Sequence, residues 1–215
     1  MILPINEIPD SLTHYIEREI IPRYAAFDMA HQENHVRKVV EESLKLTRYY
    51  DVNRTMVYVI AAFHDLGLCG GRENHHLLSG EIAWADKKLQ DWFTKEDLLI
   101  IKEAVEDHRA SNKQPPRSIY GKIVAEADRI IDPQVTLRRT VQFGLSNYPE
   151  LDKEQQYARF TRHLNDKYAE GGYLRLWIPQ SPNAARLEDL RRLIADEAAL
   201  REVFEKLYSE EPKTE

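Results

Sequence analysis

The stretch that most constrains this chain is residues 59–66, Val-Ile-Ala-Ala-Phe-His-Asp-Leu, in which an apolar run ends in the adjacent pair His64 and Asp65. Burying an imidazole beside a carboxylate costs free energy unless their charge is paired or bound to a metal ion. The run 55–63 predicts a core helix, and the glycines that follow predict its end. The pair then falls in the last helical turn, where unpaired carbonyl groups favour a cation.

Two more polar residues stand in core-like surroundings on either side of this pair. His35 lies upstream, in a segment whose apolar residues follow helical spacing. Asp128 lies downstream, in a helix predicted to end at Ile131, and it shares a face with the apolar Val124 and Ile131. Its carboxylate is therefore expected to point inward, where it needs a partner, and a cation would serve.

This ordered series, a histidine, then His-Asp, then a later helical aspartate, resembles the HD-domain metal-dependent phosphohydrolase superfamily over roughly residues 28–132. The resemblance implies a mostly helical bundle. For any single one of these histidines, a satisfied polar group of the core is the better explanation, but the four-part order, with Asp65 and Asp128 at core-like positions, favours the metal. The resemblance assigns metal binding to His35, His64, Asp65 and Asp128.

His76 and His108 occupy two further motif positions. Gly80 follows His76 by four residues, which fits the pattern better than the same count from the adjacent His75, and His108 ends another predicted helix. In superfamily members with two metal ions, histidines at these positions bind the second ion and Asp65 would bridge. In members with one ion, residues here touch phosphate instead. The sequence leaves both roles open.

The activity that the resemblance implies is that of a phosphomonoesterase or phosphodiesterase acting through metal-activated water. A small phosphorylated metabolite is the expected substrate, with a nucleotide favoured. Imidazole and carboxylate ligands together suit Mn(II), Fe(II), Ni(II) or Zn(II), as one or two ions, with Mg(II) as a less suited candidate. The residues expected to act in catalysis are Asp65, His64 and Asp128.

Position 68 departs from the superfamily pattern, because many members have a lysine there and this chain has Leu68. Three arginines near the motifs are candidates to replace that cation beside a phosphate. His31, one helical turn before His35, is expected to orient that imidazole or to touch substrate. The residues assigned to substrate binding are His31, Arg72, Arg109 and Arg129.

Two other functions stay open at this point. The first is a regulatory module that binds a metal and a nucleotide without hydrolysing it, for which the missing lysine at position 68 is the argument. The second is a di-iron oxygenase, since a few members of the resembled superfamily use oxygen.

Composition narrows the choice of partners. The formal net charge of −6 argues against a general basic surface for a nucleic acid polymer. No apolar stretch reaches the length that spans a bilayer. The single cysteine, Cys69, suits a reducing compartment, and the first residues lack the pattern of a secretory signal. We therefore expect a cytoplasmic protein without a membrane partner.

The periodicity predicts an all-α protein, an HD-like helical bundle with a C-terminal helical extension. Three segments are expected: an N-terminal helical part (1–28), a metal-binding core (29–147) and an extension packed on that core (148–215). A capping box is predicted at Thr94, and one amphipathic helix is predicted over 187–207. The aromatic stretch 173–182 packs on the core, forms the face of a homodimer or closes over a substrate, and the sequence does not choose.

Overall fold

The computed structural model describes residues 7–27, 31–129 and 131–212, and every regular element within them is helical. This confirms the all-α prediction. The chain forms two compact units, one of residues 1–130 with 177–181 and one of residues 131–176 with 182–215. The limit between them thus precedes the helix that begins at Pro133, whereas the sequence prediction ends the metal-binding core at 147. The functional division into three segments stays a prediction.

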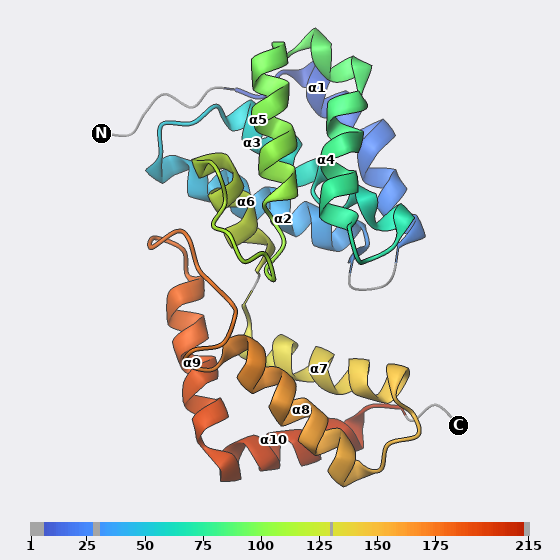
Figure 1. Ribbon diagram of the computed structural model, residues 1–215, viewed down its shortest axis with the longest axis vertical. Helices are drawn as coiled ribbons and strands as arrows, with labels where there is room; N and C mark the ends of the chain where they lie inside the picture. Colours follow the sequence, from blue (N-terminus) through green and yellow to red (C-terminus); the bar gives the residue numbers. More distant parts are fainter. Residues whose placement is uncertain (1–6, 28–30, 130, 213–215) are drawn as a thin grey trace. The chain divides into compact units, whose positions relative to one another are not determined.

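The first unit holds six α-helices among the described residues (Figure 1). Their bounds are α1 (Asp10–Tyr15), α2 (Glu33–Leu46), α3 (Arg54–Phe63), α4 (His75–Ala85), α5 (Lys95–Glu106) and α6 (Ile119–Asp128). Helix α1 continues as a π-helical segment and then a 3₁₀ segment up to Ala26. The predicted capping box forms at the start of α5, where the Thr94 side chain and the Asp97 side chain each accept from the other residue's backbone N–H.

Helix α3 lies at the centre of this unit and packs against α2, α4, α5 and α6. Every residue from Thr55 to Phe63 is buried, as expected for the core helix. The helix begins where the Asn53 side chain accepts hydrogen bonds from the N–H groups of Thr55 and Met56. Burying one Val, Ile or Phe side chain contributes about 1.5–3 kcal/mol, so this helix anchors whatever follows its last turn.

The chain leaves α3 through a tight 3₁₀ turn, Leu66–Gly70, that packs directly on the backbone of α4. The Gly67 N–H donates to Ser79 Oγ at 2.8 Å. A Cβ at Gly67 would lie 2.5 Å from Ser79 N and closer still to the carbonyl oxygen of His75. Only glycine permits this approach, which fixes the first turn of α4 beside the end of α3.

The second unit is built from α7 (Pro133–Asn147), α8 (Lys153–Tyr168), α9 (Asn183–Ala195) and α10 (Glu197–Glu210). Consecutive helices pack on one another, and α10 packs back on α7. The prediction of one helix over 187–207 was wrong. Asp196 takes an extended conformation (φ −93°, ψ 94°), and its side chain accepts from the N–H of Ala199. This geometry ends one helix and caps the next. The apolar periodicity therefore runs across a break between two helices.

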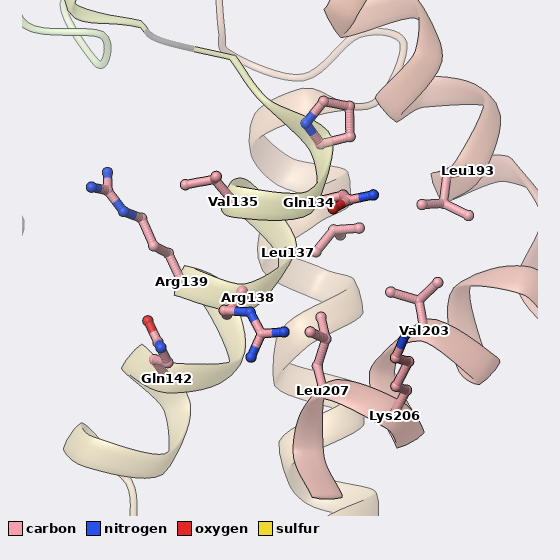
Figure 2. Close-up of a pocket in the computed structure, with 11 residues that line it drawn as sticks. Gln134, Val135, Leu137, Arg138, Arg139, Gln142, Leu193, Val203, Lys206 and Leu207 are labelled. Carbon is pink, nitrogen blue, oxygen red and sulfur yellow. The ribbon is translucent and has the colours of Figure 1, made fainter. Parts of the chain in front are cut away.

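A cavity of about 520 Å³ lies within this unit between α7, α9 and α10 (Figure 2). Its lining is partly apolar and includes Leu137, Leu193, Val203 and Leu207. The guanidinium of Arg138, also in the lining, pairs with Glu210 at 2.6 Å and with Glu211 at 2.5 Å. None of the residues that the sequence assigned to the site lines this cavity.

The segment 177–181 returns from the second unit's part of the sequence and belongs to the first unit. Ile178 is 2% exposed and lies in the core of that unit, against which Trp177 also packs. Of the three roles that the sequence left open for the stretch 173–182, the structure supports core packing for these two residues. No helix of the described residues is both long enough and apolar enough to cross a membrane.

Gly67→Ala should lower the free energy of unfolding by about 1–3 kcal/mol, the usual cost of overpacking, because the new methyl group meets backbone atoms of α4. Urea unfolding followed by circular dichroism measures it. Gly70→Ala in the same turn is the control, since its Cβ would meet only the end of the flexible Leu78 side chain. Equal effects of the two substitutions would contradict this account of the turn.

Candidate metal centre

The pair His64 and Asp65 follows the last turn of α3, and His35 reaches it from the first turn of α2. His64 Nε2 lies 3.2 Å from Asp65 Oδ2 and 3.3 Å from His35 Nε2. His35 Nε2 lies 3.7 Å from the same Asp65 oxygen. The three donor atoms therefore converge on one point from two helices, in an arrangement that could hold a metal ion.

Asp128, the last residue of α6, completes this group. Its Oδ1 atom lies 3.2 Å from His35 Nε2 and 3.7 Å from His64 Nε2. The Asp128 side chain is 21% exposed, whereas that of Asp65 is 5% exposed, so Asp128 stands on the open side of the group. The structure thus brings together all four residues of the ordered series.

A second group forms on the other oxygen of Asp65. Asp65 Oδ1 lies 3.3 Å from His108 Nε2 and 3.4 Å from His75 Nε2, and the two imidazole nitrogens are 3.2 Å apart. These atoms also fit the arrangement of a metal site. Asp65 therefore presents one carboxylate oxygen to each of two groups, and it is the residue they share.

The histidine that α4 brings to Asp65 is His75, whereas the sequence favoured His76. Neighbouring residues of a helix point about 100° apart, so only one of the two can face Asp65. Burial lowers the pKa of His76 to about 4, and its Nδ1 atom is buried without a hydrogen-bond partner. Gly80, whose spacing suggested His76, instead lies against α5, where a Cβ would be 2.6 Å from Glu106 Cγ.

Hydrogen bonds to backbone carbonyls fix the tautomers of three of these histidines. The Nδ1 atoms of His64, His75 and His108 lie 2.7, 2.9 and 2.6 Å from the carbonyl oxygens of the residues three positions earlier. Because a carbonyl only accepts, each Nδ1 carries a proton and each neutral ring presents the Nε2 lone pair to the group. The Nε2 lone pairs of His75 and His108 face each other beside Asp65, and they repel unless a cation lies among them. The donor set therefore fits a divalent metal ion.

The histidines and carboxylates of the site shift one another's pKa values. Burial would raise the pKa values of Asp65 and Asp128, but the nearby histidines hold both well below the usual range. Burial would likewise lower the pKa of His64, yet attraction by Asp65, helped by Asp128, raises it to about 9. Near neutral pH both carboxylates are thus ionised, and a proton on His64 partly balances them.

Tyr24 supports the backbone of the His-Asp pair, and sequence reasoning missed it. Its ring is fully buried, and its hydroxyl donates to the carbonyl oxygen of Ala62 at 2.9 Å. The N–H of Asp65 donates to the same hydroxyl at 3.3 Å. Burial raises the pKa of Tyr24 well above its usual value, so the hydroxyl stays protonated and keeps both roles. No sequence signal marks a residue that acts on a turn about forty positions away.

The residues assigned to substrate binding lie around these groups in different ways. The His31 ring stacks edge-on against His35, with centroids 5.8 Å apart. Arg109 donates to the carbonyl oxygen of Glu73 and Arg129 to that of Ala125. The remaining candidate, Arg72, contributes its own carbonyl oxygen as the partner of the His75 ring. Their contact with a substrate stays a prediction.

The fold and the site together define a helical protein with a His/Asp cluster suited to a divalent metal. Residues 33–131, a segment that includes every member of the two groups, match the family model described as HD domain. This matched segment makes up a little under half of the chain. The match confirms the resemblance seen in the sequence.

One solved structure shows a similar fold over nearly the whole chain. It is the crystal structure of Bacillus subtilis YpgQ in complex with ADP, at 18% sequence identity and a TM-score of 0.58. The similarity covers 94% of this chain and 96% of YpgQ. No curated protein sequence matches the chain significantly.

Metal affinity should rise with pH from about 6.5 to 9, because a cation must displace the proton that His64 holds with a pKa of about 9. Without metal, the stability that this raised pKa contributes is complete below the unfolded value of about 6.5 and is lost as pH rises through 9. Calorimetric Mn(II) titrations in buffers of different ionisation enthalpy measure both affinity and proton release. An affinity independent of pH with no proton released would contradict this assignment.

Proposed function

We propose that this protein is a metal-dependent phosphohydrolase that acts on a small phosphorylated metabolite, most naturally a nucleotide. The observation that supports it best is the sharing of Asp65 between two groups of imidazoles whose lone pairs converge. The HD domain supports the same class of activity. Mn(II), Fe(II), Ni(II) and Zn(II) suit the nitrogen-rich donor set, and Mg(II) suits it less.

The proposed ligands divide into two sets with one common member. The first set is His35, His64, Asp65 and Asp128, and the second is Asp65, His75 and His108. Divalent ions bound there would supply Lewis acidity, lowering the pKa of a water molecule and neutralising charge that develops on a phosphoryl group. His75 replaces His76 in this proposal, because only His75 faces Asp65.

The chain's own groups have distinct tasks in hydrolysis. The carbonyl oxygens of Ala61 and Val105 hold the rings of His64 and His108 in one orientation, so neither ring needs to reorganise during the reaction. The backbone of Asp65 is positioned by the hydrogen bond from its N–H to the Tyr24 hydroxyl. Asp128, the more exposed carboxylate, accepts a hydrogen bond from the attacking water and aims it at phosphorus.

The preference for a nucleotide has two supports. YpgQ, whose fold is similar over most of both chains, was crystallised with ADP. Arg109 and Arg129 each use part of their guanidinium on a backbone carbonyl, and terminal N–H groups that do not make these bonds are the donors proposed for phosphate oxygens. Arg72 and His31 are the other residues proposed to contact the substrate.

A second candidate function is a regulatory module that binds metal and nucleotide without turnover. Leu68, half-buried in the turn after Asp65, favours it, because this position lacks the cation that many family members carry. Product formation separates the two functions. A panel of nucleotides and phosphoesters, assayed with Mn(II), Fe(II), Ni(II) and Mg(II) in turn, tests for it. Binding without product under every metal would favour the module.

Asp65→Ala should reduce turnover of any substrate found in this panel by roughly 100-fold or more, since it removes an oxygen from both proposed metal sites. Phosphate release at saturating metal measures the effect, and circular dichroism checks the fold. Asp189→Ala, which removes an exposed carboxylate paired with Arg192, is the control. Turnover retained at the wild-type level in Asp65→Ala would rule out the proposed mechanism.

His75→Ala should leave one tightly bound metal ion per chain where the wild type has two, because it removes a ligand from the second set only. His76→Ala should keep both, since His76 does not face Asp65. Elemental analysis after dialysis against Mn(II) counts the ions. Loss of an ion in His76→Ala but not in His75→Ala would reverse the assignment of the two histidines.

A further inference from the structure

Glu126 is a buried carboxylate that has no role in the proposed mechanism. It lies in the last turn of α6, two residues before Asp128, and its exposed fraction is 0%. An ionised side chain is expensive to bury and is kept in a core only when hydrogen bonds or charges compensate for lost water. The partners of Glu126 therefore indicate what it does.

Those partners are backbone N–H groups of the returning segment 177–181. Glu126 Oε2 accepts from Trp177 N at 2.7 Å and from Ile178 N at 3.4 Å. The same segment is held a second time, since Tyr50 Oη donates to Gln180 Oε1 at 2.9 Å. Ile178 is buried in the core beside these contacts.

The contact joins two parts of the chain that need each other. Residues 177 and 178 are outside any helix, so their N–H groups have no partner within the segment and would be orphaned in the core without Glu126. Hydrogen bonds to an ionised carboxylate are stronger than neutral ones and more so away from water. The segment and the last turn of α6 thus fix each other's position.

We propose that Glu126 is a positioning residue for Asp128. By tying the last turn of α6 to segment 177–181, it directs the Asp128 carboxylate toward His35 and His64. Arg129 adds to this arrangement, because it donates to the Ala125 carbonyl and is attracted electrostatically by Asp128 and Glu126. The inference rests on the proposed function, in which Asp128 is a metal ligand.

Co(II) is the probe that separates positioning from simple stabilisation, because its visible absorption reports the ligands and geometry around the ion. Glu126→Ala should weaken Co(II) binding about 10- to 100-fold, the usual effect of losing a residue that orients a ligand. Its spectrum should move toward that of Asp128→Ala. Glu126→Gln should restore the wild-type spectrum, since its amide oxygen can accept the same two N–H groups.

Gln156→Ala is the matched control for lost stability. Gln156 is also buried, at 2% exposure, and its Nε2 donates to the carbonyl oxygens of Gly144 at 3.1 Å and Tyr148 at 2.7 Å. It lies in the second unit. Its truncation removes two buried hydrogen bonds to backbone, as Glu126→Ala does, but should leave the Co(II) spectrum and affinity unchanged.

If Glu126→Ala does not fold, Glu126→Asp replaces it. The shorter side chain keeps a carboxylate but moves its oxygens away from the N–H groups of Trp177 and Ile178. A wild-type spectrum and affinity in whichever of these two variants folds would overturn the positioning role. A wild-type protein that binds no Co(II) would instead contradict the proposed function itself. The two failures are therefore distinguishable in one set of titrations.

Discussion

The interaction on which the rest of the structure depends is the convergence of imidazole lone pairs on the two oxygens of Asp65. The Nε2 atoms of His64, His75 and His108 are turned inward because each ring gives its Nδ1 proton to a carbonyl oxygen. The lone pairs of His75 and His108 are thereby held 3.2 Å apart beside Asp65. A cation resolves this repulsion, and the arrangement is difficult to explain without one.

Much of the first unit serves to hold these atoms in place. Helix α3 is buried from Thr55 to Phe63, so its end is fixed, and the Tyr24 hydroxyl fixes the turn beyond it. Gly67 lets that turn contact α4 closely enough to bring His75 to Asp65. Glu126 extends the support to α6. The ligands therefore come from five helices or their ends.

The sequence predicted the all-α fold from its helical periodicity. It predicted the series from His35 to Asp128 from the order of the four residues, which resembles the HD-domain superfamily. It favoured His76, whereas His75 faces Asp65, because that choice depends on the rotation of α4, which tertiary packing sets. Tyr24 and Glu126 were missed for a related reason. Their partners are distant in sequence, and no local pattern marks a residue that supports another segment's backbone. The break at Asp196 was hidden because apolar periodicity continues across it.

The most direct test of the central claim is anomalous diffraction from crystals of the Zn(II)-loaded protein, recorded at the zinc absorption edge. We predict two peaks, one on each side of Asp65, each about 2.0–2.2 Å from a different oxygen of its carboxylate. At the second peak, we expect the zinc ion to be bound by the Nε2 atom of His75 and by no atom of His76. Zinc found only at sites that do not include Asp65 would contradict the account.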